Sequence, residues 1–249
     1  MKATGHPCTE TGLKRSLELP LLFDPGERWE YGINIDWAGQ AVERVSGQTL
    51  GEYFDDHIFS PLGMISTGFK LTPAQRARLV KVHARQPDGS LKPIDFEIKQ
   101  DPEFEAGGGG LYSTVGDYMK FCQVFLNGGK SAGGQQVLRP ETVEIVSRNQ
   151  MGALNVRPLP TQIPSLSADA EFFPGMVKKW STAFMINTEQ APTGRSPGSL
   201  AWAGLANTFF WIDPTRKITG IIMMQMLPFV EPQAIDTFTK FETATYRSV

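Results

Sequence analysis

The sequence predicts a mixed α/β (α+β) fold in which an antiparallel sheet is flanked by helices. Helical periodicity dominates residues 30 to about 150, whereas aromatic and β-branched runs separated by turn residues dominate residues 178 to 249. Helices followed by antiparallel strands are typical of this class. Because no repeat or long linker interrupts the chain, we expect residues 1–249 to form a single domain.

Apolar residues recur at helical spacing from Trp37 to Val45, and Gly47 ends this first predicted helix. A second helix follows at once, because Thr49 with Glu52 three residues later forms a capping box. We expect its buried face to consist of Leu50, Tyr53, Phe54 and Ile58.

Four consecutive glycines, Gly107–Gly110, precede the clearest helix of the chain, which has Thr114 as its N-cap. Backbone N–H groups in such a run can hold a phosphate. However, the lysine of the G-x-x-x-x-G-K-[ST] motif is absent, and so is the downstream acidic residue of the dinucleotide-binding motif. A tight structural turn that lets the backbone approach a neighbour closely is therefore the favoured interpretation. A further helix is predicted from Pro140.

Three apolar runs in the last third predict an antiparallel meander: residues 180–187, residues 200–213 with a break near Ala206 and Asn207, and residues 218–227. A final helix from Pro232, with Ile235, Phe238 and Phe241 on one face, is predicted to pack across this sheet. Residues 149–178 are rich in proline and serine and predict a long irregular loop.

Composition excludes several functions. The 24 basic and 26 acidic residues give a net charge of −2 without a basic run, so neither nucleic acid nor an anionic membrane is an expected partner. Two cysteines and three histidines without metal-ligand spacing predict no disulfide framework, no metal and no cofactor, and His57 reads as a packed or capping residue. The start, residues 1–7, lacks an apolar segment, which favours a cytoplasmic protein.

The segment Gly194–Gly198 fits the G-x-S-x-G pattern of a nucleophile elbow around Ser196. The residue after this serine is Pro197, which has no N–H to donate to an oxyanion, and more strand follows instead of a helix. A turn before a strand is the favoured interpretation, and a hydrolase that uses Ser196 is a less favoured alternative.

Three segments are more informative together: Trp29–Asn34, Glu105–Leu111 and Ser199–Asn207. Their order and separation, with Phe23–Gly26 and Phe209–Pro214, resemble the serine β-lactamase-like superfamily, which includes class C β-lactamases, DD-peptidases and family VIII carboxylesterases. The similarity runs from about Leu19 to the C-terminus. It implies a β-lactamase/transpeptidase-like fold with a helical part over residues 30–150 and a sheet and final helix over residues 178–249.

The resemblance also implies roles for particular residues. Tyr31 matches the tyrosine of the family's Y-x-N or Y-S-x motif. In the family this tyrosine takes part in the acid and base steps, and a lysine lowers its pKa. Ile33 stands where the lactamases carry asparagine, and Asn34 is the next residue. Trp202, Ala203 and Gly204 match the third motif, W-x-G in the esterases, and the N–H of Leu205 matches an oxyanion donor. Since Trp202 replaces the lysine that would hold a β-lactam carboxylate, a small-molecule ester is the expected substrate.

The family's nucleophile is the serine of an S-x-x-K motif well upstream of the tyrosine, and no serine of this chain begins such a motif. The nearest match is Thr11 with Lys14, and a single match of this kind is expected by chance. The chain therefore resembles the C-terminal part of the family fold, without the serine, its lysine and the first strands and helices. We expect a second chain that carries the missing part, self-association or a rearrangement to cover the apolar hollow and the sheet edge that this leaves. Two functions stay open: a fragment or half of a serine acyl hydrolase, and a non-catalytic binding protein that keeps the fold.

Overall fold

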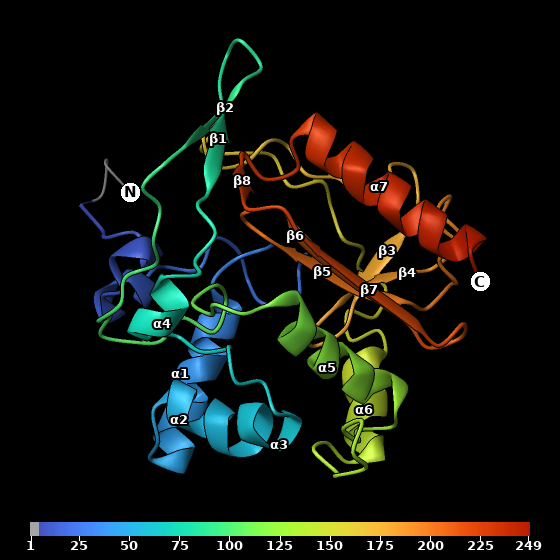
Figure 1. The fold of residues 1–249 in the computed structure, drawn as a ribbon, viewed down its shortest axis with the longest axis horizontal. Helices are drawn as coiled ribbons and strands as arrows, with labels where there is room; N and C mark the ends of the chain where they lie inside the picture. The colour runs from blue at the N-terminus through green and yellow to red at the C-terminus, as the bar shows by residue number, and fades with distance from the viewer. Residues whose placement is uncertain (1–4) are drawn as a thin grey trace. The chain divides into compact units, whose positions relative to one another are not determined.

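The computed structural model describes residues 5–249 and divides them into two compact units (Figure 1). The first unit contains the residues up to Glu27 together with Tyr31–Leu79 and Phe96–Tyr118; the second contains Arg28–Glu30, Val80–Asp95 and Met119–Val249. The prediction of a single domain stays a prediction, and residues 1–4 of the start, on which the expected location partly depends, lie outside the described residues.

The first unit is helical. Two short 3₁₀ turns, η1 (Thr9–Thr11) and η2 (Lys14–Leu17), precede α1 (Asn34–Ser46), and α4 (Pro73–Arg76) follows the other helices. The capping box of Thr49 and Glu52 is present at the start of α2 (Leu50–Phe54). This helix does not continue regularly, since it passes through the π turn η3 (Asp55–Phe59) into α3 (Ser60–Leu62).

The predicted buried face of the second helix is only partly correct. Leu50 is fully buried, whereas Tyr53, Phe54 and Ile58 are half-buried. The next buried side chain is Phe59, the last residue of the π turn. His57 is exposed and its ring lies 4.3 Å from the ring of Tyr53, so the prediction of a packed or capping histidine is corrected to a surface ring contact.

The second unit is built around an antiparallel sheet whose strands follow one another in chain order, as the meander prediction requires. Its strands are β3 (Lys178–Trp180), β4 (Met185–Asn187), β5 (Leu200–Gly204), β6 (Thr208–Asp213) and β7 (Ile218–Met223). The run predicted over residues 180–187 is two strands joined by a turn, in which the Ser181 hydroxyl accepts from the N–H of Phe184 at 2.8 Å. Residues 149–177 form the predicted irregular loop.

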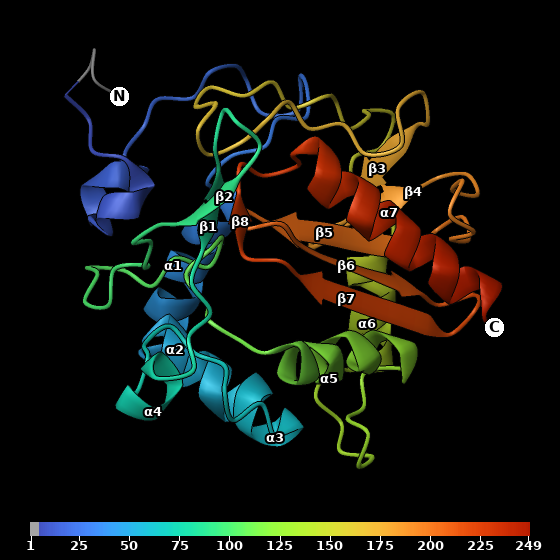
Figure 2. The same cartoon turned by 45° about the horizontal axis from the view of Figure 1, so that its top comes forward.

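The run predicted over residues 218–227 also divides. β8 (Met226–Leu227) leaves the large sheet and pairs in parallel with β1 (His83–Arg85), which pairs in turn with β2 (Leu91–Pro93). The break follows from Gln225, whose φ of 55° cannot continue an extended strand. Figure 2 shows this small sheet beside the start of α7.

Helices cover both faces of the large sheet (Figures 1 and 2). On one face lies α7 (Pro232–Arg247), whose Phe238 stacks on Phe209 with ring centroids 4.6 Å apart. On the opposite face lies α5 (Val115–Leu126), where Phe125 contacts Phe184 at 4.9 Å. The final helix therefore packs across the sheet as predicted. A further helix, α6 (Pro140–Ser147), follows α5.

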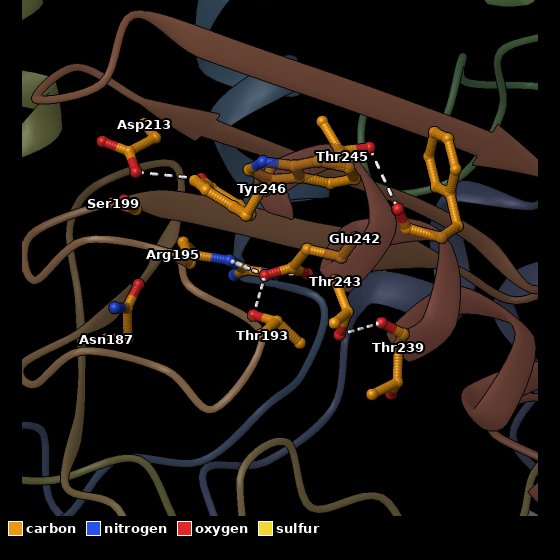
Figure 3. Close-up of polar contacts among 12 residues, drawn as sticks. Asn187, Thr193, Arg195, Ser199, Asp213, Thr239, Glu242, Thr243, Thr245 and Tyr246 are labelled. Carbon is orange, nitrogen blue, oxygen red and sulfur yellow. Dashed lines mark hydrogen bonds and ion pairs between the residues drawn. The ribbon is translucent and has the colours of Figure 1, made fainter. Parts of the chain in front are cut away.

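Buried polar contacts fasten α7 to the turns at the ends of the strands (Figure 3). Nε of Arg195 donates to Oε1 of Glu242 at 2.9 Å, and Nη2 donates to Oε2 at 2.5 Å. Both side chains are almost completely buried, and Thr193 donates a third hydrogen bond to the same carboxylate. One turn later, the hydroxyl of Tyr246 donates to Asp213 at 2.8 Å. The two parallel hydrogen bonds from Arg195 to Glu242 form the bidentate arrangement in which an arginine pairs best with a carboxylate.

Candidate functional site

Strand β5 carries three of the predicted site residues in the second unit. Trp202 lies directly opposite Phe210 and Ala203 opposite Phe209, so their side chains point to opposite faces of the sheet. Ala203 packs against the α7 face, which places Trp202 on the α5 face. β4 pairs with only Leu200 and Ala201, so the part of β5 from Trp202 to Gly204 extends beyond its neighbour.

Leu205 follows β5 directly and is 41% exposed. It opens the three-residue turn into β6, and its N–H donates to no acceptor among residues 5–249. An unpaired, accessible N–H at the end of a strand is the kind of donor that stabilises an oxyanion. The oxyanion role that the resemblance implies for this N–H stays a prediction.

Trp202 belongs to a group of half-buried aromatic side chains. Its ring lies 4.6 Å from that of Trp180 and 5.9 Å from that of Phe172, which belongs to the irregular loop. Trp180 in turn contacts Trp29 at 5.3 Å. Contacts of this kind fix ring orientation and offer a flat apolar surface. The sequence analysis gave Trp202 a role and placed Trp29 in an informative segment, but it did not connect either residue with Trp180 or Phe172, because these come from separate segments of the chain.

The remaining predicted residues, Tyr31 and Asn34, lie in the first unit. Tyr31 is 48% exposed and stands just before α1, and Asn34 is the first residue of that helix. Tyr31 and Asn34 therefore lie close together in the chain at one helix start, and Trp202 to Leu205 lie together at one strand end. The two groups belong to different units.

The glycine run packs against the start of α1 in the first unit, as a structural turn. The N–H of Gly108 donates to Oδ1 of the buried Asp36 at 2.9 Å. A Cβ on Gly108 would lie 2.8 Å from Cγ2 of Ile35, and a Cβ on Gly110 would lie 2.8 Å from Phe69. Burial raises the pKa of Asp36, and the hydrogen bond from Gly108 opposes that shift only in part. Asp36 thus links the turn to the helix that follows Tyr31.

The serine of the G-x-S-x-G pattern lies in a turn before β5, as predicted. The N–H of Ser196 donates to Asp213 at 2.9 Å, and neighbouring Arg195 is used in the ion pair with Glu242. The hydroxyl of Thr11, which with Lys14 is the nearest match to the S-x-x-K motif, donates to the carbonyl of Cys8 at 2.6 Å. The Thr11 hydroxyl thus faces a carbonyl and not a base, whereas Asp213 receives hydrogen bonds from both the backbone and the side chain of Ser196.

Within residues 5–249, no three His, Cys, Asp or Glu side chains gather in a way that could hold a metal ion. Every helix in the same residues is too short or too polar to cross a membrane.

One residue of the β5–β6 turn was missed as a site residue. Asn207 is completely buried, adopts φ +55°, and uses its side chain for hydrogen bonds to the segment that contains β8. The sequence contained a signal, since asparagine after a short turn at a strand end favours this left-handed conformation. What the sequence could not indicate is the distant segment that the side chain contacts.

The fold and these residues define a mixed α/β protein with an antiparallel meander, a covering C-terminal helix and a W-A-G strand that ends in an available N–H. The Beta-lactamase family model matches residues 4–245, so the chain belongs to this family. The resemblance seen in the sequence and the predicted fold class are thereby confirmed.

Similar proteins in this family include enzymes of acyl transfer. Monacolin J acid methylbutanoyltransferase of Aspergillus terreus is 31% identical over 258 residues, which cover 98% of this chain and 60% of that enzyme. Lovastatin esterase of Penicillium rubens is 33% identical over 243 residues, which cover 92% of this chain and 58% of that enzyme. Unliganded simvastatin synthase from Aspergillus terreus has a similar structure, with a TM-score of 0.79 and 28% identity over 94% of this chain and 59% of that chain. The chain spans about three fifths of the length of these relatives.

Proposed function

We propose that this chain provides the oxyanion strand and the proton-transferring tyrosine of a serine enzyme that moves acyl groups from esters. The observation that carries the proposal is the Leu205 N–H, which follows the W-A-G strand and has no acceptor among the described residues. Relatives named as a methylbutanoyltransferase and an esterase support the reaction class. Hydrolysis of small esters, that is carboxylesterase activity, is the form of the reaction we propose first.

In the proposed reaction, a serine hydroxyl attacks the carbonyl carbon of an ester while its proton passes to the deprotonated phenol oxygen of Tyr31. The carbonyl oxygen gains the negative charge and accepts a hydrogen bond from the Leu205 N–H. The bond to the leaving oxygen then breaks, and the released alcohol takes the proton from Tyr31. Water attacks the acyl-serine to give an acid, or a second alcohol attacks it to give a new ester.

The aromatic side chains around Trp202 support ester substrates. Trp202, Trp180 and Phe172 present aromatic faces where the β-lactamase motif would have a lysine cation. A carboxylate gains little on such a surface, whereas an apolar acyl or alcohol group is well accommodated. Ala203 and Gly204, the small residues after Trp202, allow a substrate to approach the backbone, and Asn34 is proposed to contact substrate from the start of α1.

The nucleophilic serine is proposed to come from a segment outside these 249 residues, since no serine here begins an S-x-x-K motif. Exposed apolar side chains in the first unit support such a partner segment: Trp37 is 52% exposed and Val45 is 88% exposed on α1, and Leu21 and Leu22 are exposed ahead of it. Large exposed apolar side chains mark an interaction surface where they form one patch. We propose that the segment carrying the serine covers them, and self-association is the alternative.

Activity-based labelling tests the proposal. The test protein is a chimera in which the part of the Aspergillus terreus methylbutanoyltransferase outside the matched region is fused ahead of this chain. We expect a fluorophosphonate probe to label its serine and p-nitrophenyl esters to be hydrolysed, with no labelling of the 249-residue chain alone. Replacing Tyr31 with Phe should lower kcat roughly 100-fold, as loss of a general acid and base does. The matched control Tyr53→Phe, also in the first unit, should leave kcat unchanged.

A non-catalytic binding protein is the second candidate, because the chain lacks the S-x-x-K motif. It predicts that the chimera binds an ester without turning it over and that Tyr31→Phe changes nothing. The alternative use of Ser196 as nucleophile predicts instead that the chain alone is labelled and that Ser196→Ala abolishes the labelling.

A further inference from the structure

The turn that presents Leu205 is held by one side chain. Asn207, two residues further along, donates both hydrogens of its Nδ2, to the carbonyls of Met226 and Pro228, each at 2.8 Å. Its Oδ1 accepts the N–H of Val230 at 2.8 Å. Both donors of an asparagine amide and its acceptor are thereby used, in a side chain with no exposed surface.

Backbone contacts join the same two segments. The N–H of Met226 donates to the carbonyl of Ala206 at 3.1 Å, and the N–H of Met224 donates to the carbonyl of Asn207 at 3.3 Å. The receiving segment is itself anchored, since β8 pairs with β1 and Glu231 pairs with Arg85. The turn is therefore attached to a fixed part of the second unit and not only to its own two strands.

We propose that Asn207 is the positioning residue of the oxyanion donor: its three side-chain hydrogen bonds hold the β5–β6 turn so that the Leu205 N–H keeps one direction. This inference rests on the proposed function for its catalytic meaning, but the positioning is a property of the turn itself. An oxyanion donor is effective when its direction is fixed before the reaction, because no reorganisation is then needed.

The residue type fits the task. A φ of +55° is favoured for glycine and tolerated by asparagine and aspartate, so the position excludes most side chains. Glycine would keep the turn and lose all three hydrogen bonds. Aspartate would keep the acceptor for Val230 but face the carbonyls of Met226 and Pro228 with an oxygen. Only asparagine meets both the backbone and the hydrogen-bond requirement.

A matched control exists in the same sheet. Asn187 is also buried, and its Nδ2 also donates to two carbonyls, those of Glu189 and Ser196. It lies beside the beginning of β5, because its neighbour Ile186 pairs with Leu200. Asn187→Asp therefore removes the same kind of contact at the end of the strand far from Leu205.

The experiment measures the ¹⁵N relaxation of the Leu205 amide in the full 249-residue chain. We expect an order parameter of about 0.85 in the unchanged chain and below about 0.6 in Asn207→Gly and Asn207→Asp, whereas Asn187→Asp keeps the rigid value. A rigid Leu205 amide in both Asn207 variants, a mobile one in the unchanged chain, or equal mobility in Asn187→Asp would each overturn the proposal.

Kinetics of the chimera separate this inference from the proposed function. We expect Asn207→Gly to lower kcat at least tenfold per folded molecule with little change in KM, and Asn187→Asp to leave kcat unchanged. If Leu205→Pro, which removes the N–H, leaves kcat unchanged in a folded chimera, the oxyanion role fails while the relaxation result still decides the positioning. If Leu205→Pro lowers kcat but Asn207→Gly does not, positioning by Asn207 is wrong.

Discussion

Helices α1 and α7 have similar amphipathic patterns but very different surroundings. In the second unit, α7 buries Ala234, Phe238 and Tyr246 against the sheet and adds a buried ion pair. In the first unit, α1 buries only Asp36 and Gly39 and leaves Trp37 and Val45 exposed. An apolar stripe thus predicts a helix and the face that needs covering, but it does not tell whether the covering element belongs to the same chain.

The largest expected effect comes from breaking the ion pair of α7. Replacing Glu242 with Leu leaves the buried Arg195 guanidinium without its partner, and we expect the free energy of unfolding to fall by about 4 kcal/mol, as for other broken buried pairs. Urea denaturation measures this. The double variant Arg195→Met/Glu242→Leu should be clearly more stable than the single variant, because no uncompensated charge remains.

The control for this prediction lies on the same helix. Lys240 and Asp236 form an exposed pair at 2.6 Å, and Lys240→Gln should change the free energy of unfolding by less than about 1 kcal/mol. An equal loss in Lys240→Gln and Glu242→Leu would mean that burial of the Arg195 pair does not matter.

A smaller effect is expected from the apolar contact between α7 and the sheet. Phe238→Ala removes the ring that stacks on Phe209, and we expect a loss of about 3 kcal/mol from lost burial and the cavity left behind. Denaturation monitored by circular dichroism measures it. Phe241, on the same helix but 37% exposed, provides the comparison: Phe241→Ala should cost clearly less, and equal costs would contradict the packing described for α7.

The helices and the meander were predictable because each has a local signal: capping residues at Thr49, helical spacing from Trp37 to Val45, and β-branched runs between turns. The division at Gln225 was not, because it depends on pairing between β8 and β1, two segments far apart in the sequence. The same reason explains the site. Trp202 and Leu205 were found from a contiguous motif, whereas Asn207 and Trp180 gain their roles from contacts with distant residues.

The two units also differ in how their buried aspartates respond to pH. Burial raises the pKa of Asp36. Burial acts on Asp213 in the same direction, but hydrogen bonds from Arg216, Ser196 and Tyr246 outweigh it and hold the pKa of Asp213 below its ordinary value. The folded chain therefore binds a proton at Asp36 more tightly than the unfolded chain does, and at Asp213 less tightly.

Opposite pH dependences follow. As the pH rises from 3.8 through the raised pKa of Asp36, this carboxyl loses its proton and the free energy of unfolding of the unchanged chain should fall. Asp36→Asn has no such proton to lose and should therefore become more stable relative to the unchanged chain over the same pH range. The contribution of Asp213 is present above 3.8 and is lost as the pH falls through its lowered pKa, so Asp213→Asn should be destabilised at neutral pH and converge with the unchanged chain in acid. Each unit of pKa difference corresponds to about 1.4 kcal/mol. Urea denaturation from pH 3 to 7 checks both, and parallel profiles for the two variants would contradict this assignment.

The smallest effect on the chain alone is expected at the exposed face of α1. Val45→Ser removes an 88% exposed side chain and should change the free energy of unfolding by no more than about 0.5 kcal/mol. Trp37→Gln removes a side chain that is 52% exposed and should cost about 1 kcal/mol. In the chimera the outcome should differ, since the added segment is proposed to cover this face. There, burial of a tryptophan side chain contributes about 2 kcal/mol or more, and Trp37→Gln should lower stability by a comparable amount. If Trp37→Gln has the same small effect in both proteins, the exposed face of α1 is not where the segment carrying the serine binds.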